Sequence, residues 1–245
     1  MLPGWTRISI GDHPADVFVP PGGDASKPVL FLHPVGVESL AENAAYTSAF
    51  ARFGLGCCLP ITGRSWWTDR LCPEFDLGRS AEAHLRQFVV PWMRETWQLG
   101  SKPIAVAGIS MGGQGAVRLA FRFPAEFPIA GSLAGAFDFH EWHGRGSPLD
   151  AMYRSREAAR QDTAILHLDS HRAPPHLWFA CDPTDAEWFR GNDRLAEKMR
   201  ATGVEFAADL TTEAGGHSWA YFDAMAKPLA EFLAGALAKQ GRRLL

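Results

Sequence analysis

Residues 106–115 read VAGISMGGQG, and this stretch carries the strongest fold signal in a chain of 245 residues. An unbroken apolar run over Pro103–Ile109 precedes Ser110, and a helix-compatible segment follows it. Gly108 and Gly112 flank the serine in a Gly-x-Ser-x-Gly pattern. A strand that turns abruptly into a helix strains its central residue, and flanking glycines remove the Cβ atoms that would collide there. The stretch therefore predicts a buried strand, a sharp turn that raises the Ser110 hydroxyl, and a helix.

Strand-like and helix-like segments alternate on both sides of this turn. Apolar runs without polar alternation are typical of strands covered on both faces, and their alternation with helices indicates an α/β fold with a mostly parallel sheet. The predicted strands are Trp5–Ile10, Ala15–Val19, Pro28–His33, Gly56–Pro60, Pro103–Ile109, Phe127–Ala134, His176–Cys181 and Val204–Leu210. The predicted helices are Leu40–Phe53, Gly78–Trp97, Met111–Phe123, Ala186–Thr202 and Ala220–Ala238.

The length and the order of elements predict one domain over residues 1–245, because a single core can reach this size. The first two strands, joined through residues 11–14, predict an antiparallel hairpin at the sheet edge. Residues 135–175 form one long irregular connection after the sixth strand. They are too many for a simple crossover. We interpret them as a small lid-like insertion over a site.

Composition narrows the function classes. A net charge of −3 with interspersed charges argues against nucleic-acid binding, and 47% hydrophobic residues suit a soluble globular chain. The amino terminus lacks the basic and apolar regions of a signal peptide, and no apolar run reaches membrane-span length, so we expect a cytoplasmic protein unless a leader was removed beforehand. Four cysteines without paired spacing predict structural thiols. They are Cys57, Cys58, Cys72 and Cys181.

A serine hydroxyl is a poor nucleophile at neutral pH and needs a positioned base. His217 is the best candidate among nine histidines, because it lies in a glycine-bordered loop after the last predicted strand and before the last helix. A histidine there completes the chain order serine, carboxylate, histidine that accompanies a serine at a strand-to-helix turn. We therefore expect His217 to be the base for Ser110.

The acid of such a triad should follow the strand His176–Cys181. The sequence CDPTD over 181–185 offers two carboxylates. Asp182 precedes a proline and can open a turn, and Asp185 could instead be a helix N-cap. We favour Asp185 as the acid, since the turn at Asp182 would leave it projecting toward the loops. Asp182 stays as the alternative.

Two backbone N–H groups should form an oxyanion hole. Met111, directly after the serine, supplies one, and the loop HPVGV over 33–37 supplies the other. Pro34 has no N–H, so Val35 is the expected donor and Gly36 the second choice. His33 is expected to brace this loop.

These motifs together resemble a known family. The order HPVG (33–36), GISMGGQG (108–115), CDPTD (181–185) and GGHSWAYF (215–222) is similar to the "putative esterase" branch of the α/β-hydrolases, which includes feruloyl esterases, esterase D and S-formylglutathione hydrolases. The resemblance extends over about residues 28–235 and implies a triad of Ser110, Asp185 and His217. The family usually has glycine at the position of Pro34, which reshapes the oxyanion loop here.

Nine tryptophans suggest an aromatic pocket. Trp66 and Trp67 follow a strand end, where binding loops lie in such sheets, and could line an acyl or sugar pocket or pack as core. Trp219 is close to His217 and is expected to pack against it; we count it with the other two as substrate-binding. Weaker pocket candidates are Trp142 and Trp188.

Metal binding is the rival interpretation of the histidines. The sequence HEWH over 140–143 is one residue short of an HExxH box, and His167 and His171 have helical spacing close to two prolines. Neither pair has an obvious third ligand, so we expect no metal and no cofactor.

The expected activity is hydrolysis of a small-molecule carboxylic ester through an acyl-enzyme. The alternatives are an acyltransferase or thioesterase with the same triad, or a non-catalytic binding protein on this fold.

Overall fold

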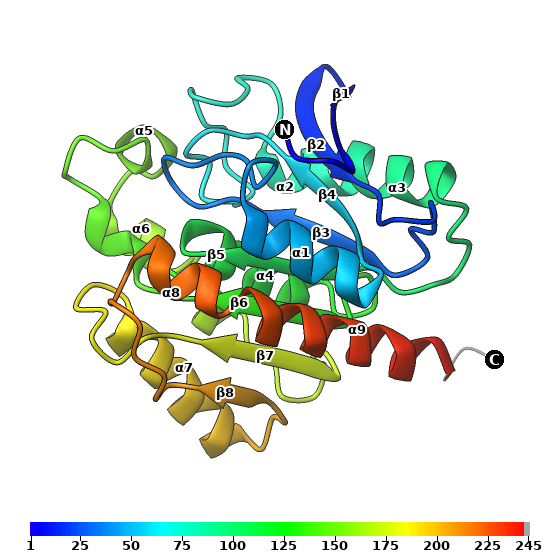
Figure 1. The fold of residues 1–245 in the computed structure, drawn as a ribbon. Helices are drawn as coiled ribbons and strands as arrows, with labels where there is room; N and C mark the ends of the chain where they lie inside the picture. The colour runs from blue at the N-terminus through cyan, green and yellow to red at the C-terminus, as the bar shows by residue number, and fades with distance from the viewer. Residues whose placement is uncertain (243–245) are drawn as a thin grey trace.

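The computed structural model describes residues 1–242. Its eight strands form one sheet in the order β1, β2, β4, β3, β5, β6, β7, β8, in which every pairing from β4 onward is parallel (Figure 1). The first two strands form an antiparallel hairpin at one edge, as predicted. The strands are β1 (Trp5–Ile10), β2 (His13–Phe18), β3 (Pro28–Leu32), β4 (Gly56–Pro60), β5 (Ala105–Ile109), β6 (Ile129–Leu133), β7 (His176–Ala180) and β8 (Ala207–Asp209).

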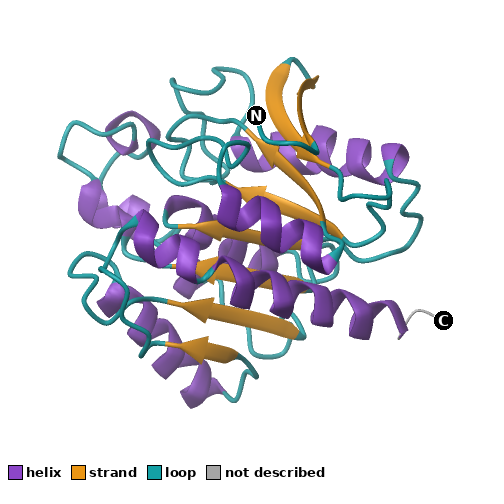
Figure 2. Cartoon of the chain, in the orientation of Figure 1, coloured by secondary structure: helices purple, strands orange, loops and turns teal. Residues whose placement is uncertain are grey.

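Helices cover both faces of the sheet (Figure 2). Successive residues of β3 point to opposite faces, so Leu30 and Leu32 join one hydrophobic core and Val29 and Phe31 join the other. The first core packs under α3, α4 and α7, and the second under α1 and α9. The helices are α1 (Ala44–Phe53), α2 (Ala81–His84), α3 (Val90–Thr96), α4 (Met111–Arg122), α5 (Leu149–Met152), α6 (Arg156–Arg160), α7 (Phe189–Thr202), α8 (Trp219–Ala224) and α9 (Ala226–Arg242).

Local chemistry explains where elements begin and end. The hairpin turn is only Gly11 and Asp12, both with positive φ (54° and 69°), so the second strand begins at His13 and not at Ala15. The first helix begins at Ala44, later than predicted, because the Asn43 side chain caps it by accepting the N–H of Tyr46.

Two predicted helices are subdivided. The segment predicted as Gly78–Trp97 begins after a Ser80 cap and runs as α2, a π-helical turn over Leu85–Val89, and α3. The last predicted helix is two helices that meet at Met225. Pro228 in the first turn of α9 has no N–H to continue the preceding helix.

The connection 135–175 contains short helices rather than irregular chain alone. It holds α5, α6 and two single 3₁₀ turns over Phe139–Trp142 and Ala164–Leu166. Its far end is tied to α4 by Arg118, whose guanidinium is 2.5 Å from a carboxylate oxygen of Asp162 in the insertion and 2.5 Å from Glu82 in α2. Arg118 is almost wholly buried (1% exposed), so this ion-pair cluster is interior.

Candidate active site

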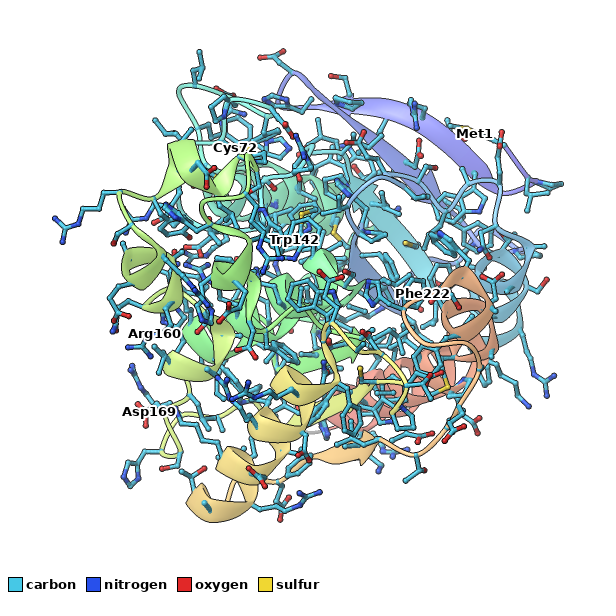
Figure 3. The ribbon with its side chains drawn as sticks, turned by 90° about the vertical axis from the view of Figure 1, so that its left-hand side faces the viewer. Met1, Cys72, Trp142, Arg160, Asp169 and Phe222 are labelled. Atoms are coloured by element: carbon cyan, nitrogen blue, oxygen red, sulfur yellow. The ribbon has the colours of Figure 1, made fainter. Side chains whose placement is uncertain are left out.

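The parallel strands all end at one edge of the sheet, where their following loops meet the insertion. Figure 3 looks onto this end, with Trp142 of the insertion near the centre and Phe222 of α8 beside it. In open α/β sheets, ligands bind in the crevice at the carboxyl ends of the strands. All the residues singled out as triad candidates lie in loops or helix starts at this edge.

Ser110 occupies the strained turn that its glycine neighbours predict. Its φ of 54° and ψ of −114° place it between β5 and α4, and its N–H donates to the carbonyl of Leu133 (2.8 Å). A Cβ on Gly112 would lie 1.9 Å from the carbonyl oxygen of Leu32, and one on Gly108 would lie 2.4 Å from the Gly112 backbone. Only glycine at both positions permits this close approach of β3, β5 and α4.

Ser110 meets His217 and Asp185 in a continuous hydrogen-bond chain. The Nε2 of His217 lies 3.0 Å from Ser110 Oγ, and its Nδ1 lies 2.8 Å from Asp185 Oδ2. Because a carboxylate only accepts, Nδ1 carries the proton and Nε2 is free to accept the serine hydroxyl. Asp185 is fully buried at its side chain, whereas His217 is 27% exposed. This is the geometry in which an imidazole can take the serine proton.

The Asp185 carboxylate is held from several sides. Its Oδ1 accepts the backbone N–H groups of Glu187 (3.0 Å) and Trp188 (2.9 Å), and the Cys181 thiol donates to Oδ2 (3.7 Å). Burial raises the pKa of Asp185, but the hydrogen bonds from His217 and the backbone outweigh it and leave the pKa below its ordinary value. The group is therefore ionised, and its two oxygens are fixed in place.

Asp182 has a different set of partners. Its Oδ1 accepts from the N–H and hydroxyl of Thr184 (2.7 and 2.6 Å), and its Oδ2 accepts the N–H groups of Ala214 (2.6 Å) and Gly216 (2.9 Å). Burial opposes ionisation, yet these donors bring the pKa of Asp182 to about 2. Asp182 thus ties the loop that carries His217 to the turn that carries Asp185, and does not itself contact His217.

The loop after β3 lies beside Ser110. His33 is fully buried; its Nδ1 donates to the carbonyl of Pro34 (2.8 Å), and its Nε2 accepts the N–H of Thr62 (3.1 Å). Burial lowers the pKa of His33 to about 4, so the ring is neutral and braces the loop. Val35 lines the same cavity as Ser110. Met111 is the first residue of α4, where an N–H has no acceptor within the helix.

An aromatic cavity of about 250 Å³ opens at Ser110 and His217. Trp66 forms part of its wall, in a left-handed conformation (φ 53°), and stacks on Phe139 at 5.3 Å between ring centroids. Gln114, one helical turn after Ser110, donates its side-chain N–H to the Trp66 carbonyl and so supports this wall. The lining residues are Pro34, Val35, Trp66, Ser110, Trp142, Glu187, Trp188, His217, Ser218, Trp219 and Phe222.

The tryptophans expected to bind substrate take different places. Trp67 is fully buried beneath the cavity, where its Nε1 donates to the His33 carbonyl (3.2 Å), so it supports the loop and is not part of the cavity wall. Trp219 lines the cavity but packs edge-to-face against Phe222, and the ring contacts of His217 are with Phe222 and Trp188.

Sequence reasoning missed two supporting roles. The anchoring of the histidine loop by Asp182 depends on a contact between residues 32 or more positions apart, which no local pattern reveals. The supporting role of Gln114 had a weak signal in the sequence, because a residue four positions after Ser110 lies on the same side of the helix as the turn.

The histidines considered as metal ligands have separate partners. His143 Nε2 lies 2.9 Å from the carbonyl of Tyr153, and His167 pairs with Asp162 (3.1 Å). Within residues 1–242, no group of three or more His, Cys, Asp or Glu side chains is arranged to hold a metal ion.

The helices of this same range include none that is both long and apolar enough to cross a membrane.

Comparison with known proteins places the chain in a family. The profile of the "Putative esterase" family matches residues 61–229, which is most of the chain and includes the Ser110 turn and the His217 loop. The chain belongs to this esterase family. Its fold is an α/β-hydrolase fold, and similar solved structures bear this out. Against the S-formylglutathione hydrolase FrmB of Staphylococcus aureus the TM-score is 0.77 at 16% identity, with 94% of this chain and 99% of that chain covered.

Two further relatives of this esterase-family chain differ in kind. The fluorophosphonate-binding serine hydrolase FphF of Staphylococcus aureus superposes with a TM-score of 0.75 at 17% identity over 94% of this chain and 97% of that chain. A sequence match to "Diacylglycerol acyltransferase/mycolyltransferase Ag85C" of Mycobacterium avium is 33% identical over 97 residues. That match covers 36% of this chain and 28% of the relative, so it spans only about a quarter of that protein's length.

Proposed function

We propose that this esterase-family protein hydrolyses small-molecule carboxylic esters through an acyl-enzyme on Ser110. The observation that carries the proposal is the chain of hydrogen bonds from Ser110 Oγ to His217 and from His217 to the buried Asp185, at the mouth of the aromatic cavity. A nucleophile, a base and an orienting carboxylate within hydrogen-bond distance are the arrangement that activates a serine.

The reaction runs in two halves. Ser110 Oγ attacks the ester carbonyl as His217 Nε2 takes its proton, and the N–H groups of Met111 and Val35 stabilise the oxyanion. His217 returns the proton to the leaving alcohol, and Asp185 stabilises the imidazolium without becoming protonated. Water, deprotonated by His217, then attacks the acyl-enzyme and releases the acid. The protein's own groups supply each of these steps.

The dimensions of the cavity favour a short acyl group. About 250 Å³ lies below the range of typical drug-sized ligand pockets, and aromatic side chains form much of the wall. We propose that residues 135–175 act as its lid-like wall, since Trp142 of that segment packs on Trp66 (5.7 Å) and Trp188 (6.0 Å). Acetyl to butyryl esters should therefore be cleaved faster than octanoyl esters.

The test uses p-nitrophenyl acetate with wild type and Ser110→Ala. We expect turnover by the wild type and a loss of about 10⁴-fold or more in the variant, with an unchanged circular dichroism spectrum and melting temperature. Comparable turnover by the folded Ser110→Ala protein would overturn the proposal.

The match to Ag85C makes acyl transfer the second candidate. Product analysis with added alcohol acceptors distinguishes it, because a transferase forms new ester in preference to free acid.

A further inference from the structure

Aromatic rings border the cavity at Ser110 in a continuous run. The ring centroid of Trp142 lies 5.7 Å from that of Trp66 and 6.0 Å from that of Trp188. The His217 ring continues the run, since it lies 6.4 Å from Trp188 and 5.2 Å from Phe222. Phe222 in turn lies 5.5 Å from the next ring. We name the lining tryptophans and phenylalanine the aromatic wall: Trp66, Trp142, Trp188, Trp219 and Phe222.

The lining of this cavity includes one carboxylate and no lysine or arginine. That carboxylate is Glu187, whose Oε1 accepts the Nε1–H of Trp142 (2.7 Å) and which forms no salt bridge within residues 1–242. Its backbone N–H donates to Asp185, so the turn that holds Asp185 also fixes Glu187. Asp185 balances the charge that His217 gains when it takes a proton. Glu187 is therefore the carboxylate that is left to pair with a cation of the ligand.

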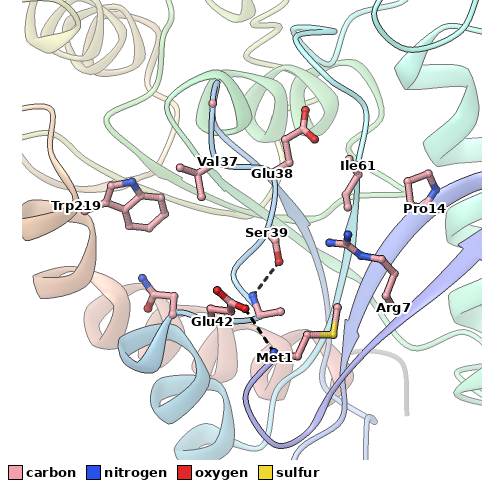
Figure 4. Close-up of a pocket in the computed structure, with 12 residues that line it drawn as sticks. Met1, Arg7, Pro14, Val37, Glu38, Ser39, Glu42, Ile61 and Trp219 are labelled. Carbon is pink, nitrogen blue, oxygen red and sulfur yellow. Dashed lines mark hydrogen bonds and ion pairs between the residues drawn. The ribbon is translucent and has the colours of Figure 1, made fainter.

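The neighbouring cavity beside the amino-terminal hairpin has a different character (Figure 4). Its volume is about 780 Å³, and Arg7 is part of its wall, where it pairs with Asp16 (2.7 Å). Glu42 in the same wall pairs with the amino group of Met1 (3.6 Å). A guanidinium in the wall repels a cationic ligand. Of these two cavities, the smaller one combines several aromatic rings with an unpaired carboxylate.

The aromatic wall and Glu187 together suit one kind of charged group. The face of an aromatic ring attracts a cation within about 6 Å of its centroid, and the attraction increases where water is excluded. Trp66 and Trp188 are almost wholly buried (1% and 3% exposed), so a group held against these rings is removed from water. A primary ammonium would lose hydrogen bonds to water there, whereas a quaternary ammonium has no N–H to leave unsatisfied. The cavity chemistry therefore favours a quaternary ammonium group.

We propose that the aromatic wall and Glu187 form a subsite for a quaternary ammonium group, and that the protein prefers esters with a short, cationic acyl chain. The inference rests on the proposed function, which places the acyl group in this cavity, and it names the substrate class of that same site. Ester and water give the trimethylammonio acid and the free alcohol, with the proton returned through His217.

Two p-nitrophenyl esters of equal shape test this preference. One carries the 4-(trimethylammonio)butyryl group, and the other carries the 5,5-dimethylhexanoyl group, in which a carbon atom replaces the charged nitrogen. We expect kcat/KM for the cationic ester to exceed that for the neutral ester by about tenfold or more, after each value is divided by the rate of hydroxide-catalysed hydrolysis. A cavity that is merely apolar would favour the neutral ester, because it buries the larger apolar surface without desolvating a charge.

Variants separate the ring from the carboxylate. Trp142→Leu and Trp142→Phe both lose the hydrogen bond to Glu187, but only phenylalanine keeps an aromatic ring. We expect leucine to lower the ratio of the two kcat/KM values about fivefold and phenylalanine to lower it less than twofold. Glu187→Gln keeps an acceptor for Trp142 and should lower the ratio about threefold. The matched control is Glu231→Gln on the exposed face of α9, which should leave the ratio and the turnover of p-nitrophenyl acetate unchanged.

Each outcome bears on a different claim. Cleavage of p-nitrophenyl acetate with equal or faster hydrolysis of the neutral ester contradicts the ammonium subsite and leaves the proposed function standing. Unchanged ratios in folded Trp142→Leu and Glu187→Gln proteins contradict the subsite as well, and melting temperatures establish that the variants are folded. A preference for acetylcholine over 3,3-dimethylbutyl acetate, with none between the two acyl esters, contradicts the acyl placement. A wild-type protein that does not cleave p-nitrophenyl acetate contradicts the proposed function itself.

Discussion

Two aspartates three positions apart support the same histidine by different routes. Asp185 contacts the imidazole directly at 2.8 Å, and Asp182 holds the loop around it through the N–H groups of Ala214 and Gly216. Both are buried, so an alanine at either position would remove activity and would not distinguish the roles. Asparagine preserves the side-chain volume and separates orientation of the base from attachment of its loop.

We expect Asp185→Asn to reduce kcat by about 10³ to 10⁴-fold with a small change in unfolding free energy, because the amide holds the wrong imidazole tautomer. We expect Asp182→Asn to lower the unfolding free energy by about 2–3 kcal/mol, because charge-assisted hydrogen bonds to the loop are lost. Steady-state kinetics and urea titration of both variants measure this. The assignment fails if Asp182→Asn is inactive at full stability while Asp185→Asn keeps its turnover.

At the scale of elements, the contact of β3 with the start of α4 sets the position of Ser110. Gly112 touches the Leu32 carbonyl where no Cβ fits. Gly235 in α9 is exposed, and a Cβ added there would meet no atom within 4 Å. A glycine-to-alanine substitution should therefore change the unfolding free energy in opposite directions at these two positions.

Gly112→Ala should lower the unfolding free energy by about 3 kcal/mol or more, because α4 must move away from β3. Gly235→Ala should raise it by about 0.5–1 kcal/mol, because alanine restricts the unfolded chain and favours the helix. Urea unfolding of the two variants compares them directly. Equal effects would show that the close approach at Gly112 does not constrain the turn.

The elements with unbroken apolar runs were predictable, and their ends were less so. The strand at 56–60 was predicted at its observed bounds, and Ser110 was placed between its strand and helix, because burial and glycine spacing are local signals. The short helices within 135–175 have too few residues for a periodic pattern. The wall role of Trp66 and the burial of Trp67 depend on two successive left-handed residues (φ 53° and 55°), a conformation that bulky side chains rarely adopt.

At the scale of the whole molecule, two buried histidines link folding to pH. Burial lowers the pKa of His33 to about 4, and burial with the nearby positive charges of His13 and Arg79 lowers that of His84 to about 4. In the unfolded chain both return to about 6.5. Between pH 6.5 and 4 the unfolded state therefore binds more protons, and the stability gained from these neutral rings is lost as the pH falls.

We expect the unfolding free energy to fall by about 1.4 kcal/mol per pH unit for each of these histidines near the middle of that window. His84→Phe should reduce this slope by about 1.4 kcal/mol per pH unit, because it removes one of the two titrating groups. Phenylalanine suits the site, since its neighbours Phe75 and Phe88 form an aromatic environment. The exposed His171, replaced by glutamine, is the control. Urea titrations at several pH values provide the measurement, and an unchanged slope in His84→Phe would contradict the coupling.

The Arg118 cluster has a consequence for how specificity can change. Arg118 in α4, the helix that follows Ser110, pairs with Asp162 of the insertion, and Tyr153 donates its hydroxyl to the same carboxylate (2.7 Å). The cavity wall at Trp142 lies outside this attachment. Phe139 and Leu149 are fully buried, and Ala136 donates its N–H to the Ser110 carbonyl (3.0 Å), so the start of the insertion is part of the core. Residues 141–147, which are exposed or half-buried, are the part whose exchange would reshape the proposed acyl pocket and leave α4 in place.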